Sequence, residues 1–192
     1  MAKESTFSNM VITLFAVCLV SSAVVGGIYA LTEKPIDEAK TAKVNSAISG
    51  VVPAFDNDPS AERFTVTADG KTASVYPARK NGEIVGYAVE ANTSKGFGGA
   101  ITLMVGFEPD GTIYNTAVIS HSETPGLGDK IDAKKSNFSV QFNGKNPENF
   151  RLVVKKDGGD VDAITASTIS SRAFCDAVET AFKTFKNIQP NE

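Results

Sequence analysis

The chain has few of the residues that build disulfides and metal centres, with two cysteines and one histidine among 192 residues. Cys18 lies in an apolar stretch and Cys175 near the end of the sequence, so we expect neither a bridge between them nor a Cys/His zinc or iron–sulfur site. A basic excess is also absent, because 22 acidic residues outnumber 19 basic ones. That balance argues against nucleic-acid binding.

The common catalytic motifs are incomplete. Residues 70–72 match the end of a phosphate-binding P-loop, but Thr65 stands where that motif needs a glycine. The Gly-x-Gly segments at 96–98 and 126–128 lack the third glycine of a dinucleotide-binding fingerprint. In residues 120–122 a serine flanks the histidine on each side, and neighbours on a strand point to opposite faces. We therefore expect neither a hydrolase of familiar design nor any catalytic or metal-ligating residue.

Residues 10–31 contain no charged side chain. About 20 residues at about 1.5 Å each cross a hydrocarbon core of about 30 Å, so this stretch predicts a transmembrane helix after a short tail at residues 1–9. The alternative is a cleaved signal peptide. It is disfavoured because the apolar run is long and Lys3 is the one basic side chain before it. Lysines on both flanks leave the orientation undecided.

The polar remainder predicts a stalk and one α+β domain. Residues 32–55 are charged and alanine-bearing before prolines interrupt them, which indicates a helical stalk and linker. Residues 56–192 form the predicted domain. Its alternating segments are separated by the turn pairs Asp69-Gly70, Asn81-Gly82 and Asp110-Gly111, which predicts one antiparallel sheet. Apolar residues at helical spacing then predict a helix packed on that sheet: Phe174, Val178, Ala181, Phe182, Phe185 and Ile188.

Two segments have compositions that suit a ligand-binding site. Residues 123–130 read ETPGLGDK, where Pro125 fixes φ and two glycines allow a backbone to approach a flat ligand closely. Residues 162–171 read DAITASTISS and precede the predicted helix. Capping a helix needs one hydroxyl residue and this stretch has five, while the free N–H groups of a helix N-terminus also form a phosphate site. A rigid turn and a simple cap remain the alternatives.

These segments resemble those of a known flavoprotein family. Asp162-x-x-Thr165-Ala166-Ser167-Thr168 resembles the flavinylation signature Asp-x-x-(Ser/Thr)-Gly-Ala-Thr, with Ala166 and Ser167 in place of the usual glycine and alanine. Together with ETPGLGDK, Gly86-Tyr87 and residues 96–101, the chain resembles the G subunits of the Rnf ion-translocating electron-transport complexes over nearly its whole length. The C subunits of the sodium-translocating NADH:quinone reductases are the nearest alternative.

The resemblance implies a covalent FMN, joined through its phosphate to Thr168 by a flavin transferase. Thr165 and Ser167 would donate hydrogen bonds to the phosphate, and Asp162 would serve recognition by the transferase. The loop expected to lie against the isoalloxazine comprises Glu123, Thr124, Pro125, Gly126, Leu127 and Gly128.

The implied role is an electron relay between the other membrane and peripheral subunits of the complex. The single-pass chain would sit in the cytoplasmic (inner) membrane with its domain on the extracytoplasmic side. The residues alone leave two other classes open. One is a membrane-anchored binding or scaffold domain without flavin, and the other is a flavin reductase with a substrate of its own.

Overall fold

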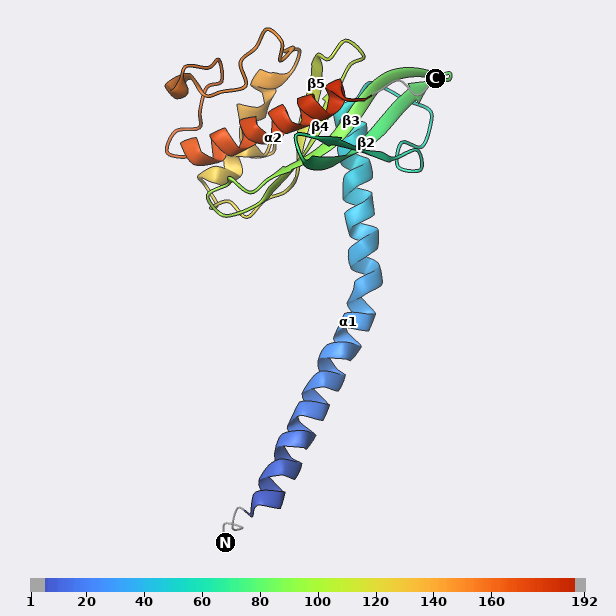
Figure 1. Ribbon diagram of the computed structural model, residues 1–192, viewed down its shortest axis with the longest axis vertical. Helices are drawn as coiled ribbons and strands as arrows, with labels where there is room; N and C mark the ends of the chain where they lie inside the picture. Colours follow the sequence, from blue (N-terminus) through green and yellow to red (C-terminus); the bar gives the residue numbers. More distant parts are fainter. Residues whose placement is uncertain (1–5, 189–192) are drawn as a thin grey trace. The chain divides into compact units, whose positions relative to one another are not determined.

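The computed structural model describes residues 6–188 and divides into two compact units, Met1–Ala42 and Lys43–Glu192 (Figure 1). The helix α1 (Phe7–Val51) begins in the first unit, where its large apolar side chains from Phe7 to Ile36 are exposed. The predicted apolar N-terminal helix is confirmed, and α1 is long and apolar enough to cross a membrane. Lys3 and most of the predicted tail at residues 1–9 lie outside the described residues.

In the second unit, the described residues form one five-stranded antiparallel sheet in the order β1-β2-β3-β4-β5. The strands are β1 (Phe64–Ala68), β2 (Lys71–Lys80), β3 (Glu83–Thr93), β4 (Ile101–Phe107) and β5 (Ile113–Ser120). Asp69 and Gly70 have φ angles of 51° and 75°, and Asn81 and Gly82 have 53° and 85°. Two-residue hairpin turns of type I′ require positive φ at both central positions, which explains these pairs. The predicted sheet is confirmed.

One face of the sheet packs against α2 (Thr168–Lys186) (Figure 1). Phe174, Val178 and Ala181 on this helix are fully buried in the same core as the strand residues Leu103 and Val105. Aromatic stacking extends the contact, with the rings of Phe107 and Phe185 centred 5.0 Å apart. The predicted amphipathic helix and the α+β class are therefore confirmed.

The chain between β5 and α2 forms three short 3-10 helices, η1 (Gly128–Ile131), η2 (Phe138–Phe142) and η3 (Lys155–Asp157). Ile131 and Phe142 from these turns are fully buried in the core beneath α2. The sequence did not predict these elements, because a 3-10 helix of three to five residues is too short to establish a periodic pattern.

The opposite face of the sheet packs against the last turns of α1. Ile48 and Val51 are buried there with Tyr76 and Met104. These contacts place residues 43–51 in the same compact unit as the sheet, although the sequence assigned them to the stalk over residues 32–55. Gly106 on β4 allows the approach, because a Cβ built there would lie 1.6 Å from the carbonyl oxygen of Val51.

This close approach predicts that Gly106→Ala destabilises the domain. The new methyl group meets backbone atoms, which cannot rotate away, so we expect a loss of about 3 kcal/mol and a fall in Tm of about 8 °C. Thermal unfolding of the full chain in detergent measures it. Gly50→Ala is the matched control, since a Cβ at Gly50 meets nothing within 4 Å. Alanine favours helix there, so the control should keep or slightly raise the Tm. Equal losses in both variants would contradict the packing argument.

Candidate functional site

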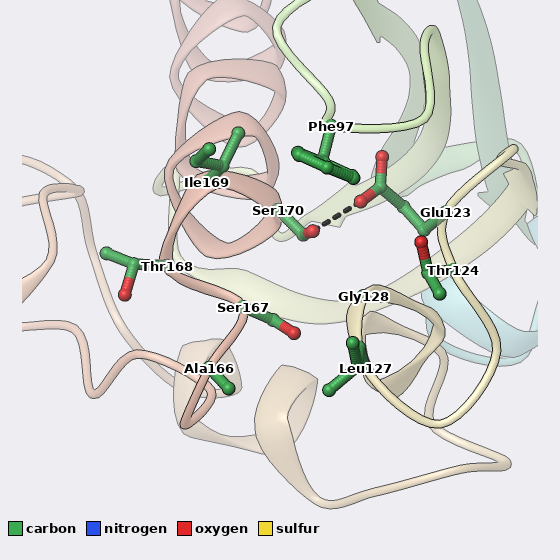
Figure 2. A pocket seen from close by; sticks show the side chains of 10 residues that line it. All are labelled: Phe97, Glu123, Thr124, Leu127, Gly128, Ala166, Ser167, Thr168, Ile169 and Ser170. Carbon is green, nitrogen blue, oxygen red and sulfur yellow. Dashed lines mark hydrogen bonds between the residues drawn. The ribbon is translucent and has the colours of Figure 1, made fainter.

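A cavity of about 350 Å³ lies where α2 begins, between two loops of the second unit (Figure 2). Its volume falls within the range typical of small-molecule sites. One loop follows β3 and the other follows β5. The residues lining the cavity are Phe97, Glu123, Thr124, Leu127, Gly128, Ala166, Ser167, Thr168, Ile169 and Ser170.

Glu123 joins the three segments around this cavity. The residue is 5% exposed, and both of its carboxylate oxygens accept hydrogen bonds. Oε1 accepts the backbone N–H of Gly98 at 3.0 Å, and Oε2 accepts the hydroxyl of Ser170 on α2 (Figure 2). A buried carboxylate needs such donors, so each contact holds one segment against the loop that carries Glu123.

Glycines pack tightly around this carboxylate. A Cβ at Gly96 would lie 2.6 Å from Glu123 Oε1, and one at Gly128 would lie 2.5 Å from Oε2 and 2.6 Å from the hydroxyl of Ser170. Gly126 is different, because open space surrounds it and its φ of +78° accounts for the glycine. The two glycines of the predicted loop therefore have separate structural reasons, close packing at Gly128 and a left-handed backbone at Gly126.

The start of α2 offers free backbone donors. The N–H of Ser171 donates to the carbonyl of Ser167 at 3.0 Å, which begins the helical pattern. Helix geometry then leaves the N–H groups of Thr168, Ile169 and Ser170 without a carbonyl partner inside the helix. Ser167 is the N-cap residue, yet its side chain makes no capping hydrogen bond. These donors and the positive end of the helix dipole favour an anion at this point.

Ala166 precedes the helix in a left-handed conformation, with φ at 62°. A Cβ destabilises this conformation by about 1–2 kcal/mol, whereas glycine adopts it freely. The motif that the sequence resembles has glycine at this position, and the backbone angle supplies the physical reason for that preference.

The hydroxyl groups near the helix start differ in their partners. Ser171 Oγ donates to the carbonyl of Ser167 at 3.0 Å and accepts the N–H of Ile164 at 2.9 Å. Ser170 is engaged by Glu123. Ser167 is 7% exposed, and its Oγ has no hydrogen-bond partner among the described residues. Leaving a buried hydroxyl unpaired costs about 1–3 kcal/mol.

Figure 2 shows the Ser167 side chain directed into the cavity, on the side of Leu127 and Gly128. An acceptor oxygen bound in the cavity would complete the hydrogen bonding of this hydroxyl. The Thr168 side chain lies at the cavity edge on the other side of the helix start and is half-buried. A hydroxyl in that position is open to a reaction partner from outside.

Six of the predicted site residues line the cavity together: Glu123, Thr124, Leu127, Gly128, Ser167 and Thr168. The other four, Asp162, Thr165, Pro125 and Gly126, are exposed and lie outside the lining set. Asp162 pairs with Lys155, with Nζ and Oδ2 2.8 Å apart. Its carboxylate therefore faces solvent near the helix start rather than the cavity.

Four lining residues were not predicted as site residues: Phe97, Ala166, Ile169 and Ser170. Phe97 lies in the glycine-rich segment at 96–101, where the sequence pattern concerned the glycines and gave no signal for the aromatic ring. Ser170 belongs to the hydroxyl run but pairs with a residue 47 positions away. Such a long-range pair leaves no local pattern in one sequence.

His121 and Cys175 are not available as reactive groups at this site. Nδ1 of His121 accepts the backbone N–H of Glu123 at 3.1 Å. Burial raises the pKa of the Cys175 thiol to about 12, so it does not form a nucleophilic thiolate at neutral pH. Between residues 6 and 188, His, Cys, Asp and Glu form no group of three or more that could hold a metal ion.

Comparison with known proteins agrees with this geometry. The family model for the FMN-binding domain matches residues 96–183, a stretch that contains every residue lining the cavity. A protein of Vibrio atlanticus (strain LGP32) is 37% identical over 183 residues, covering 91% of this chain and 87% of its own length. One of Yersinia pestis is 39% identical over 169 residues, covering 83% and 81%.

A third relative, from Aliivibrio fischeri (strain ATCC 700601 / ES114), is 35% identical over 192 residues and covers 95% of this chain and 90% of its own length. All three relatives are named as the G subunit of an ion-translocating oxidoreductase complex. The chain therefore belongs to the family of the G subunits of ion-translocating oxidoreductase complexes, and it contains an FMN-binding domain.

Proposed function

We propose that this chain is a membrane-anchored flavoprotein that carries FMN covalently on Thr168 and relays electrons within an Rnf-type ferredoxin:NAD⁺ oxidoreductase complex. One observation carries the proposal: the cavity at the start of α2 combines an unpaired buried hydroxyl, free helix N–H groups and the half-buried Thr168. The whole cavity lies in the stretch that matches the FMN-binding domain.

The phosphate of FMN suits the helix start. An ester through Thr168 Oγ1 would put the remaining phosphate oxygens near the free N–H groups of the first turn and near Ser167 Oγ. Thr165, exposed on the preceding turn, could add a hydroxyl donor from outside the cavity. Each of these contacts would stabilise the negative charge of the phosphate. The free N–H groups in the first turn of α2 and the helix dipole favour the same charge.

The flat ring of FMN suits the rest of the cavity. Thr124 and Leu127 face it from the loop after β5, and Pro125 and Gly126 continue that loop at the surface. Glu123 lies beneath them with both oxygens engaged, so it acts on the ring through the segments that it holds. The bound FMN supplies the electron chemistry, while the chain binds and orients it.

Attachment of FMN would use a flavin transferase, the partner implied by the resemblance of residues 162–168 to the flavinylation signature. Phosphoryl transfer depends on positioning and charge neutralisation, which a flavin transferase would bring. Asp162 is exposed, six residues before Thr168, and is available as a recognition carboxylate.

The anchor makes the covalent bond useful. If the domain lies on the extracytoplasmic side of the inner membrane, a lost FMN is not readily replaced there. Anchoring by a single pass of residues 10–31 would raise the effective concentration of the flavin beside membrane-embedded partner subunits. A sodium-translocating NADH:quinone reductase would use the same arrangement, but the names of the relatives favour an ion-translocating oxidoreductase complex and its G subunit.

Replacement of Thr168 tests the attachment site. Thr168→Val keeps the side-chain shape and removes the acceptor oxygen, so covalent FMN should disappear from the intact mass of chain made with a flavin transferase. Thr165→Val is the matched control, since it removes an exposed hydroxyl from the turn just before α2. It should still carry covalent FMN, because Thr168 supplies the ester oxygen and the loss of one hydrogen bond, about 1 kcal/mol, slows loading by about fivefold at most. FMN that persists on Thr168→Val would place the bond elsewhere.

Ser167→Ala tests the phosphate site separately from the ester. Without FMN the variant should be as stable as the parent or up to about 1 kcal/mol more stable, because it removes an unpaired buried hydroxyl. Its FMN loading per unit time should fall, because a donor to the phosphate is lost. Urea unfolding and timed mass spectra measure the two effects.

Ser171→Ala provides the contrast. It removes two hydrogen bonds of a fully buried side chain and should destabilise the chain by about 1–3 kcal/mol. Equal stability losses in Ser167→Ala and Ser171→Ala would show that Ser167 is paired in solution and would remove it from the phosphate site.

The alternative of an independent flavin reductase gives a different kinetic result. The glycine segments lack a complete dinucleotide fingerprint, so the purified, flavin-loaded chain should not oxidise NADH by itself. Absorbance of NADH with a quinone or dye acceptor measures this. Sustained turnover would favour the reductase over the relay.

A further inference from the structure

We propose that Phe97 is the side chain that packs against the isoalloxazine ring of FMN, and that the hydrogen bond from Gly98 to Glu123 holds it in place. This inference rests on the proposed function, because it needs FMN in the cavity at the start of α2. It assigns a binding role to a residue outside both predicted segments.

Phe97 is unusually exposed for a large aromatic side chain in the folded domain. It is 70% exposed, and it lines the cavity (Figure 2). By contrast, Phe107, Phe142 and Phe174 are fully buried, and Tyr114 on β5 is 43% exposed. An exposed ring at the mouth of a cavity is apolar surface that a bound ligand can remove from water.

The backbone beneath Phe97 is fixed, so its exposure does not come from a loose loop. The N–H of Gly98 donates to Glu123 Oε1 at 3.0 Å. A Cβ at Gly98 would lie 1.9 Å from the carbonyl oxygen of Ser122, and one at Gly96 would lie 2.3 Å from that of Gly99. The glycines on both sides thus pack against neighbouring backbone, while the phenylalanine between them projects outward.

Two further exposed apolar side chains share the cavity with Phe97. Leu127 is 43% exposed and Ile169 is 47% exposed, and each comes from a different segment. In the view of Figure 2, Phe97 lies at one end of the cavity and Leu127 at the other, with Ser170 and Gly128 between them. The arrangement suits a flat, largely apolar ring that is open to solvent on part of its edge.

The hydrogen bonding of Glu123 explains how distant residues reach the ring. Glu123 holds Gly98 through one oxygen and Ser170 through the other, so the ring of Phe97 and the start of α2 keep a fixed separation. Glu123 is therefore a positioning residue that acts through Phe97. A glutamine at this position has one acceptor oxygen, so it can accept from Gly98 or from Ser170. Its NH₂ group would then face the other donor.

Iodide quenching of flavin fluorescence tests the proposal in the full-length, FMN-loaded chain in detergent. Phe97→Ala should raise the quenching constant about twofold, because it uncovers one of the two faces of the ring. Phe97→Tyr keeps an aromatic ring and should match the parent. Glu123→Gln should raise quenching in the same direction as Phe97→Ala. Intact mass, measured on each sample, reports FMN content separately.

Val140→Ala is the matched control, since Val140 is 52% exposed but lies outside the cavity lining. It should leave quenching unchanged. Parent-like quenching in a fully loaded Phe97→Ala, or an equal rise in Val140→Ala, would overturn the role of Phe97. Parent-like quenching in Glu123→Gln would overturn its positioning by Glu123. A parent chain without the mass of FMN would overturn the proposed function, and this inference with it.

Discussion

The site depends on one buried carboxylate. Glu123 is buried, and its two oxygens accept hydrogen bonds from two different segments, the N–H of Gly98 after β3 and the hydroxyl of Ser170 on α2. Because an unsatisfied buried carboxylate is strongly unfavourable, these two contacts stabilise the loop that carries Glu123. The close approach of Gly96 and Gly128 to the same carboxylate follows from this arrangement, as does the position of Phe97 at the cavity mouth.

The start of α2 supplies the hydrogen-bond donors of the site. Its first N–H groups and the hydroxyl of Ser167 are donors with no acceptor among residues 6–188, while the Ser170 hydroxyl donates to Glu123 as a structural contact. The hydroxyl run therefore serves three purposes. Ser171 and Ser170 hold the fold, Ser167 faces the cavity with an unpaired oxygen, and Thr168 lies at its edge. A phosphoester at that edge would place anion, helix dipole and flavin ring in one continuous site.

Local patterns in the sequence predicted most of the fold. The turn pairs Asp69-Gly70 and Asn81-Gly82 predict hairpins because their positive φ angles are a local requirement, and the stripe on α2 reflects its burial. Residues 128–161 resisted prediction, because short 3-10 turns and irregular chain bury Ile131 and Phe142 without periodicity. At the site, residues within the two motifs, such as Thr124 and Thr168, were predicted as site residues. The pairing of Glu123 with Ser170 was not, because it joins residues far apart in the chain.

The proposed electron-carrier role depends on attachment of FMN to Thr168 through its phosphate. Peptide mass spectrometry of the full chain extracted from native membranes tests it most directly, by locating any added FMN among the five hydroxyl residues at 162–171. We expect one FMN phosphoester, on Thr168, with Thr165, Ser167, Ser170 and Ser171 unmodified. An unmodified Thr168, or FMN attached to a different residue, would contradict it.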